Sequence, residues 1–322
     1  MSEIVLQVNQ LQKRFANVNA VDGVNFSLAQ GQIHGLIGRN GAGKTTTIRM
    51  AMGIFFPDGG TIQLFGAPWS ADALDRVGYL PEERGMYRKM KLLEHLRFFC
   101  ALKGAKGPVV EKRLTDFLKR FDLWNRRDDN IETLSKGNQQ KAQLAGVLAF
   151  DPNLIILDEP MSGLDPVNVI LVRELLLELK AAGKTILLST HQMGEAERLC
   201  DTVTLIDHGR VVLAGNLDEI RRSHGARKIT LEFSGDGANL SGLPGVASLR
   251  VEGDTAHFTM TEDLPPDQLL RAALDRVRVT RFDAGEASLE EIFIKFAGPE
   301  MAGERPPAAV VKTETVEASH AN

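Results

Sequence analysis

One stretch of this sequence decides the fold, and it reads Gly38-Arg39-Asn40-Gly41-Ala42-Gly43-Lys44-Thr45. The apolar run Ile33–Ile37 precedes it, and a helical pattern over residues 46–52 follows it. Glycines let the backbone wrap so that its N–H groups point inward, while the next helix presents its positive end. The pattern predicts a phosphate-binding loop in which Lys44 reaches the β and γ phosphates and Thr45 ligates Mg²⁺. A plain glycine-rich turn is the alternative, and the flanking strand and helix disfavour it.

The second decisive feature is an apolar strand that ends in two carboxylates. The run Leu154–Asp158 is followed directly by Glu159. Such a pair makes sense at the end of a buried strand if Asp158 helps to hold Mg²⁺ while Glu159 polarises the attacking water. Taken alone, the stretch is equally compatible with a core strand that meets a solvated acidic turn. Combined with the glycine-rich loop, it predicts a nucleoside triphosphate site.

A third stretch narrows the class of site, and it reads Leu134-Ser135-Lys136-Gly137-Asn138-Gln139-Gln140. It resembles the signature sequence of ABC ATPases, whose common form is Leu-Ser-Gly-Gly-Gln, with Lys136 and Asn138 as departures. Ser135 and the Gly137 amide at a helix start would form an anion site. The phosphates bound by the same chain are already enclosed by their own loop, so the ligand is expected to come from a second subunit. A helix that is simply capped by Ser135 is the alternative.

Other elements of ABC ATPases follow in order. The stretch Ser162-Gly163-Leu164-Asp165-Pro166 resembles the D-loop, which crosses the dimer interface. His191 matches the switch histidine that contacts the γ phosphate, although a histidine after a strand is usually incidental. Phe15 matches the aromatic residue on which adenine stacks, and Val21 could line the same pocket. The alternative for Phe15 is packing beneath the first sheet.

One departure from the family pattern is Glu82, which stands where most ABC ATPases have a glutamine. Glutamate keeps an oxygen that could ligate Mg²⁺, but it adds a negative charge near the phosphates. The stretch Pro81-Glu82-Glu83-Arg84-Gly85 resembles the sodium-extrusion and drug-export branch of ABC ATPases. The later stretch Ser288-Leu289-Glu290-Glu291-Ile292-Phe293 resembles the C-terminal extension of that branch.

The motifs and the resemblance together give a set of expected site residues. The residues expected to bind ATP are Phe15, Val21, Gly38, Arg39, Asn40, Gly41, Ala42, Gly43, Lys44, Thr45, Thr46, Ser135, Gly137 and Asp165. The expected catalytic residues are Lys44, Glu159 and His191. The expected Mg²⁺ ligands are Thr45, Glu82 and Asp158.

The chain is predicted to hold two domains, since 322 residues at roughly 100 to 200 per domain allow about two. Short β runs alternate with helical patterns over 1–220, which predicts an α/β domain with a largely parallel sheet, the P-loop NTPase fold that the ABC ATPase resemblance implies. The β signal fades over 88–146, where a helical insertion is expected. A small α+β domain is predicted over 221–298. The segment 299–322 is expected to be disordered, because it shows no apolar period.

Composition excludes several classes of protein. A net charge of −4 argues against a chain that mainly coats nucleic acid. Cys100 and Cys200 are isolated, so neither a zinc site nor a disulfide framework is indicated. No run of about 18 apolar residues and no secretory signal are present, so the chain is expected in the cytoplasm. The resemblance implies that it lies against the inner face of the membrane.

The resemblance implies an ATP-hydrolysing subunit of an ABC transporter, of the exporter kind. Two copies, or one copy and a similar ATPase subunit, would meet head to tail around ATP. A separate transmembrane permease subunit would dock near the helical insertion and residues 82–87. One alternative is an ABC ATPase that acts on nucleic acid or ribosomes, but those usually carry a long coiled-coil insertion or two ATPase units. Another is a regulatory module with impaired turnover, which the presence of Lys44, Glu159 and His191 disfavours.

Overall fold

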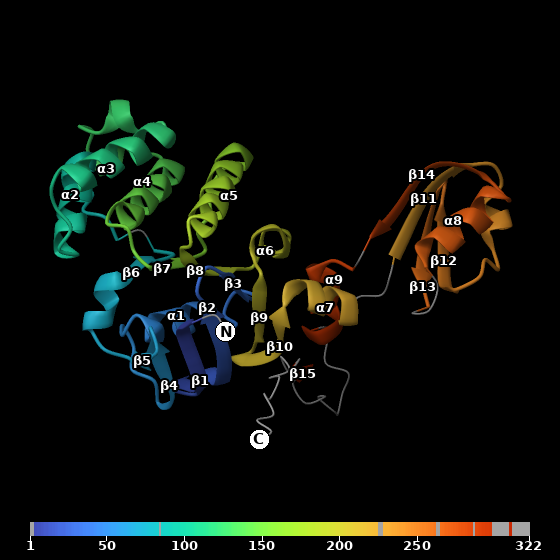
Figure 1. Cartoon of the computed structure of the whole chain (residues 1–322), viewed down its shortest axis with the longest axis horizontal. Helices are drawn as coiled ribbons and strands as arrows, with labels where there is room; N and C mark the ends of the chain where they lie inside the picture. The colour runs from blue at the N-terminus through green and yellow to red at the C-terminus, as the bar shows by residue number, and fades with distance from the viewer. Residues whose placement is uncertain are drawn as a thin grey trace, which may run out of the picture. The chain divides into compact units, whose positions relative to one another are not determined.

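The computed structural model describes residues 3–83, 85–224, 228–261, 265–285, 287–297 and 309–310. These residues fall into two compact units that divide between Gly215 and Asn216, with 309–310 belonging to the first unit (Figure 1). Within the described part of the chain, no helix has the length and apolar character needed to span a bilayer.

The first unit is built on a seven-stranded sheet with the order β15-β10-β9-β3-β8-β7-β6. Its strands are β3 (Ile33–Ile37), β6 (Val77–Leu80), β7 (Leu154–Asp158), β8 (Thr185–Thr190), β9 (Thr202–Asp207), β10 (Arg210–Asn216) and β15 (Ala309–Val310). Strands β3, β7 and β8 are buried along their whole length, as their continuous apolar sequences require of central parallel strands. Because β3, β8 and β7 run parallel, their carboxyl ends meet at one edge of the sheet. That edge brings the glycine-rich loop beside Asp158.

The first unit also contains α-helices and short 3₁₀ turns. The α-helices of the first unit are α1 (Lys44–Ala51), α2 (Leu92–Leu102), α3 (Pro108–Arg120), α4 (Lys136–Ala149), α5 (Pro166–Ala181) and α6 (Met193–Leu199). Short 3₁₀ turns are η1 (Asp72–Arg76), η2 (Trp124–Arg126) and η3 (Ile131–Thr133). Helices α2, α3 and α4 pack together as one group between β6 and β7 in the chain (Figure 1). Helical structure thus occupies the segment in which the insertion was expected.

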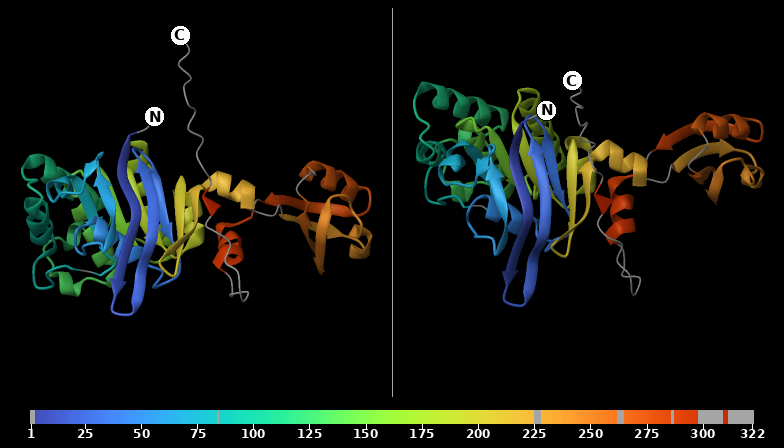
Figure 2. Two further views of the ribbon diagram at one scale, coloured as in Figure 1. Left: turned by 90° about the horizontal axis from the view of Figure 1, so that it is seen from below. Right: turned by 60° about the horizontal axis from the view of Figure 1, so that its bottom comes forward.

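A second, antiparallel sheet in the first unit is not predicted by the sequence pattern. It has the order β2-β1-β4-β5, with β1 (Ile4–Phe15), β2 (Val18–Ala29), β4 (Gly59–Leu64) and β5 (Ala67–Pro68), and stands as its own layer in Figure 2. Only residues 4–8 are expected as strand from periodicity. The remainder of β1 is obscured by register shifts after Val8 and by Gln10, which takes a positive φ of 48°. Its inner face packs with α1 in the apolar core of this unit.

The second unit has a core of its own. It consists of α7 (Leu217–His224), β11 (Lys228–Ser234), η4 (Gly237–Leu240), β12 (Val246–Glu252), β13 (Thr255–Met260), α8 (Pro266–Leu274), β14 (Arg278–Gly285) and α9 (Leu289–Ala297). The four strands form an antiparallel sheet with the order β12-β13-β11-β14. Buried residues such as Leu231, Phe258 and Leu269 make up its core. The arrangement is the small α+β domain that the pattern predicts.

The segment 299–322, which is expected to be disordered, lies outside the described residues except at Ala309–Val310. These two residues form β15 and pair in parallel with β10, Ala309 opposite Leu213. An edge strand offers unpaired backbone groups to any extended segment, so pairing there needs no apolar period in the sequence.

Candidate functional site

The glycine-rich loop connects β3 to α1, and its glycines are required by close backbone contacts. A Cβ atom at Gly38 would lie 2.2 Å from the carbonyl oxygen of Ile206. Gly43 has a φ of +110°, and a Cβ atom there would lie 2.4 Å from the carbonyl oxygen of Ala20. Real Cβ atoms do not approach backbone this closely, and L side chains rarely adopt that φ. The loop therefore keeps its shape only with glycine at these positions.

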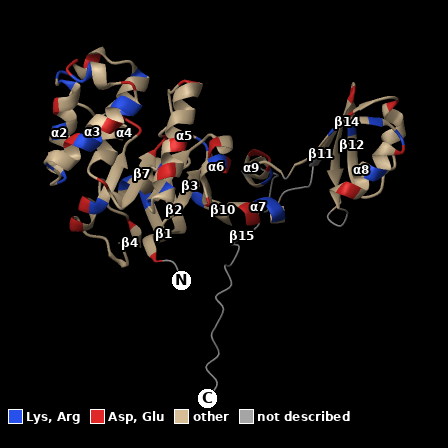
Figure 3. Ribbon diagram, turned by 45° about the horizontal axis from the view of Figure 1, so that its top comes forward, with Lys and Arg blue, Asp and Glu red and all other residues tan. Residues whose placement is uncertain are grey.

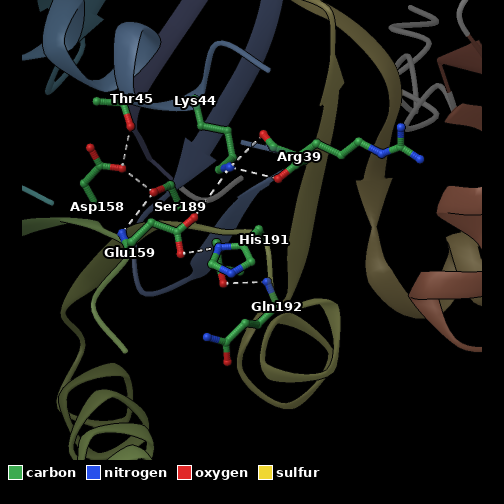
Figure 4. Close-up of polar contacts among 10 residues, drawn as sticks. Arg39, Lys44, Thr45, Asp158, Glu159, Ser189, His191 and Gln192 are labelled. Carbon is green, nitrogen blue, oxygen red and sulfur yellow. Dashed lines mark hydrogen bonds and ion pairs between the residues drawn. The ribbon is translucent and has the colours of Figure 1, made fainter. Parts of the chain in front are cut away.

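Lys44 points back into the loop from the first turn of α1. Its Nζ donates to the carbonyl oxygens of Gly38 at 2.8 Å and Arg39 at 3.2 Å. The same Nζ lies 3.5 Å from Oε1 of Glu159, and the side chain is only 6% exposed. Figure 4 shows that the Arg39 side chain points away from Lys44, so Arg39 meets the lysine only through its backbone. The loop thus holds an ammonium group where phosphate oxygens would need a positive charge.

Glu159 is fixed by its backbone as well as by its side chain. It takes a φ of +51°, which is uncommon for a residue with a Cβ atom. Its N–H donates to Ser189, with the carbonyl oxygen at 3.2 Å and Oγ at 3.1 Å. Its Oε2 lies 3.0 Å from Nδ1 of His191, while its other oxygen, Oε1, faces Lys44 (Figure 4). A buried carboxylate is costly without partners. His191 lies within hydrogen-bond distance of Oε2, whereas Oε1 has no hydrogen-bond partner among the described residues and has the Lys44 ammonium group 3.5 Å away.

Asp158 is fully buried at the end of β7. Its Oδ1 accepts hydrogen bonds from Oγ1 of Thr45, at 3.1 Å, and from Oγ of Ser189. Its Oδ2 is buried and has no hydrogen-bond partner within the described part of the chain. An unpartnered carboxylate oxygen beside a threonine hydroxyl suits Mg²⁺, which takes oxygen ligands.

The residues around Asp158 do not form a complete metal cage. Across the ranges that the structure describes, no group of three or more His, Cys, Asp or Glu side chains could hold a metal alone. Mg²⁺ commonly binds through one or two protein oxygens together with substrate phosphates and waters. Thr45 and Asp158 therefore fit a magnesium ion that arrives with a nucleotide.

Two residues near this centre are missed by the sequence motifs. Ser189, at the end of β8, contacts both Asp158 and the N–H of Glu159. Tyr79, on β6, lies near enough to Asp158 that burial and the carboxylate charge raise the pKa of its hydroxyl to about 12. The only signal available for either residue is its position near the carboxyl end of a strand next to β7.

Glu82 lies two residues after β6, and its side chain is exposed. No hydrogen bond or ion pair joins it to Thr45 or Asp158 in the described residues. Its charge contributes to the raised pKa of Tyr79, after burial and Asp158. The structure thus brings Glu82 to the neighbourhood of the centre without placing it in contact with the other two expected metal ligands.

Ser135 and Asp165 both lie at helix starts. Oγ of Ser135 accepts from the N–H of Asn138 at 3.3 Å and caps α4. Oδ1 of Asp165 accepts from the N–H of Asn168 at 3.0 Å and caps α5, and these hydrogen bonds lower the pKa of Asp165. Within the described residues of this single chain, no hydrogen bond or ion pair joins either side chain to Lys44, Glu159 or His191.

The signature segment and the D-loop segment are neighbours. A Cβ atom at Gly137 would lie 3.6 Å from Cδ2 of Leu164 and 3.7 Å from the carbonyl oxygen of Gly163. Contacts of this length are ordinary van der Waals distances, so the two segments touch without strain. Any ligand that reaches Ser135 would therefore also lie near the segment that ends at Asp165.

The two residues expected at the base differ in their surroundings. Phe15, at the end of β1, is 40% exposed. Val21 is 2% exposed and packs in the apolar core instead of lining an open pocket. It lies opposite Lys13 in the β1–β2 pairing, a position that the sequence does not reveal. The structure leaves Phe15 available to a base, whereas the burial of Val21 leaves little of its surface to contact one.

Comparisons with known proteins agree with this geometry. A family model described as ABC transporter matches residues 21–162, and one described as the C-terminal domain of DrrA1-3-like ATP-binding proteins matches 215–297. The ABC transporter ATP-binding protein YhaQ of Bacillus subtilis is 36% identical over 91% of this chain and 99% of its own. The Nod factor export ATP-binding protein I of Ralstonia nicotianae is 36% identical over 92% of this chain and 95% of its own.

A solved ATP-binding subunit of an ABC transporter superposes with a TM-score of 0.64 at 37% identity, covering 68% of this chain and 92% of that one. The match extends over a share of the chain close to that of the first unit. Sequence, fold and site geometry lead to the same assignment: the chain belongs to the ATP-binding proteins of ABC transporters.

Proposed function

We propose that this chain hydrolyses ATP with Mg²⁺ and thereby drives export through a separate membrane subunit. The observation that carries the proposal is the position of Glu159, buried between Lys44 and His191 at the mouth of the phosphate-binding loop. A carboxylate held there can act as a general base toward a water molecule placed in line with the γ phosphate.

The contacts of Glu159 suggest how ATP would activate it. Lys44 would turn from Glu159 to the β and γ phosphates, and His191 would turn to the γ phosphate. Glu159 would then lose its contacts with both Lys44 and His191 and become free to orient water. The charge that develops on the phosphate would be offset by Lys44 and by loop N–H groups that are already in place.

Thr45 and Asp158 would hold the magnesium ion. When bound, Mg²⁺ supplies positive charge that offsets the charge of the phosphate oxygens. Glu82 would add a further oxygen only if the loop after β6 moved inward, since its side chain is exposed here.

The remaining expected residues are proposed to act on the base and across a dimer. Phe15 would stack on adenine, as exposed aromatic rings do with bases. Ser135, Gly137 and Asp165 would meet the ATP held by a second copy. Their location on two adjacent helix starts that do not touch the Lys44 centre of the same chain supports this arrangement.

The exporter role and the membrane partner rest on the relatives and on one surface. The Ralstonia relative is named for Nod factor export. Tyr87, Phe98 and Leu102 are exposed at the helical insertion, and the rings of Tyr87 and Phe98 lie 5.9 Å apart. An apolar surface of this kind suits a protein partner, and we propose that the permease subunit docks here, at the inner face of the membrane.

Charge distribution favours transport over action on nucleic acid. Figure 3 shows Lys and Arg interspersed with Asp and Glu along α2 and α3, and the whole sequence has 38 Lys and Arg against 42 Asp and Glu, without the basic excess that a phosphate backbone favours. The family model and the export relative point the same way.

Steady-state ATPase measurements on Glu159→Gln test the catalytic proposal. Glutamine keeps the shape of the side chain but cannot accept a proton, so kcat should fall about 100-fold or more. Glu94→Gln, which changes an exposed glutamate of α2, is the matched control and should keep the original rate. An unaltered kcat in Glu159→Gln would show that another group activates the water.

A further inference from the structure

We propose that Asp58 is a positioning residue for the base site, because it fixes the backbone that presents the Phe15 ring. The inference rests on the proposed stacking of adenine on Phe15 and adds a residue outside every motif in the sequence. Asp58 lies in the segment between α1 and β4, next to the β1 residues that lead to Phe15.

Phe15 needs external support because of its place in the fold. It is the last residue of β1 and pairs with Val18 across a tight turn. Ala16, in that turn, takes a φ of +47°, and a register shift falls between Lys13 and Arg14. Strained turns with irregular pairing persist only where their surroundings fix them.

Asp58 makes three contacts to three consecutive residues of β1. Its own N–H donates to the carbonyl oxygen of Gln12 at 2.9 Å. Its Oδ1 accepts from Nζ of Lys13 at 2.8 Å, and its Oδ2 accepts from the N–H of Arg14 at 2.8 Å. One carboxylate thereby holds the strand on both sides of the register shift. The same two side-chain hydrogen bonds lower the pKa of Asp58, so it stays ionised at neutral pH.

Lys13 extends this contact toward the ring itself. Its Nζ also donates to the carbonyl oxygen of Phe56 at 2.7 Å and lies 5.6 Å from the centroid of the Phe15 ring. The 16% exposure of the Lys13 side chain shows that it is held against the protein and does not extend into water. Asp58 therefore also sets where a positive charge lies relative to the stacking ring.

Phe55 also contacts the Phe15 ring, but it borders an open cavity. Its ring meets that of Phe15 edge to face, with centroids 5.3 Å apart. Phe55 also lines an apolar cavity of about 310 Å³, together with Met50, Ile62 and Trp69. A ring beside open volume has room to shift. The hydrogen bonds of Asp58 are therefore the better-defined restraint on Phe15.

Calorimetric titration with two ligands, each with Mg²⁺, tests the proposal. ADP carries the base, whereas inorganic pyrophosphate carries only the phosphates, and neither can undergo γ-phosphate hydrolysis. Phe15→Ala should weaken ADP binding at least about fivefold, since base stacking on aromatic rings is worth that much or more. Asp58→Ala should weaken ADP binding about threefold or more and leave pyrophosphate binding unchanged. Asp116→Ala removes an exposed carboxylate of α3 and is the control, with no expected change.

The double variant and a conservative variant separate positioning from general damage. If Asp58 acts through Phe15, Asp58→Ala should add nothing in the Phe15→Ala background, and Asp58→Asn, which keeps one acceptor, should be intermediate. Equal weakening of ADP and pyrophosphate, additive losses in the double variant, or unchanged ADP binding in Asp58→Ala would each overturn the inference. Unchanged ADP binding in Phe15→Ala would instead refute the proposed stacking itself, and the inference with it.

Discussion

His34 is buried in β3 between two threonines of the neighbouring strand β9. Its Nδ1 lies 2.8 Å from Oγ1 of Thr202, and its Nε2 lies 3.0 Å from Oγ1 of Thr204. A neutral imidazole donates through one nitrogen and accepts through the other, and hydroxyls can satisfy both. Burial lowers the pKa of His34 to about 3, well below its usual value of 6.5.

This shift predicts that acid destabilises the first unit through His34. Below pH of about 6.5 the unfolded chain binds a proton at this residue, whereas the folded chain does not until pH of about 3. The free energy of unfolding should therefore drop by about 1 kcal/mol between pH 7 and 5.5 from His34 alone. Trp69 and Trp124 both lie in the first unit, so tryptophan fluorescence during urea unfolding reports on it. The variant His34→Asn should lose less stability over this pH interval, and an equal loss would contradict the account.

Ser189 gives a second prediction about a single side chain. Ser189→Ala leaves Oδ1 of Asp158 with Thr45 as its remaining donor and leaves the N–H of Glu159 with only a carbonyl acceptor. A hydrogen bond to a buried charged group is worth about 1.5 to 3 kcal/mol. We expect a lower kcat and a higher Mg²⁺ requirement in ATPase assays, because both acidic residues lose alignment. Ser189→Thr, which restores a hydroxyl, should recover part of the rate, and normal turnover in Ser189→Ala would show that the contact is dispensable.

The sequence motifs point to the proposed site residues that lie within a recognisable stretch. They miss the residues that make hydrogen bonds to the site from another part of the chain. Lys44, Asp158 and Glu159 each follow or end a strand within a recognisable stretch. Ser189 and Asp58 contribute through hydrogen bonds to residues far away in the chain, and a serine or aspartate alone carries no sign of its partner.

Helix α5 begins at a cap that is also a proposed dimer contact, and the two roles can be separated. Asp165→Ala removes the acceptor for the N–H of Asn168, which should lower the urea concentration at the unfolding midpoint. Asp165→Asn keeps an acceptor and should unfold at nearly the original midpoint, because asparagine caps helices about as well as aspartate. Urea unfolding and ATPase rates are measured on both variants. If Asp165→Asn is stable yet slow, the side chain acts across the dimer, whereas parallel losses would reduce it to a cap.

Elements with a strong local pattern are the ones that the sequence predicts well. The strand β7 occupies the range of its apolar run, Leu154–Asp158. Strand β2 and most of β1 are missed, because register shifts and polar positions interrupt the alternation of buried and exposed residues. These strands are held by pairing with each other and by the core beneath them, information that no short window of sequence contains.

Because the two units have separate apolar cores, we expect the first unit to fold without the second. A chain that ends at residue 216 keeps the whole apolar core of the first unit and lacks the whole apolar core of the second. Its unfolding midpoint, followed by tryptophan fluorescence, should match that of the full chain closely, as should its affinity for ADP. A large drop in the midpoint would show that the second unit, or the pairing of β15 with β10, stabilises the ATP-binding unit.

We propose that ATP joins two copies of this chain through Ser135 of one and the Lys44 loop of the other. The most direct test is the mass of Glu159→Gln by light scattering with and without ATP, starting from a chain of 35.3 kDa. We expect a monomer without ATP and a doubled mass with it. The dimer should be lost when Ser135→Arg adds bulk, whereas Ser135→Ala, which removes both the α4 cap and the proposed hydroxyl contact with ATP, should weaken it less. A protein that binds ATP and stays monomeric, or a dimer that survives Ser135→Arg, would contradict the claim.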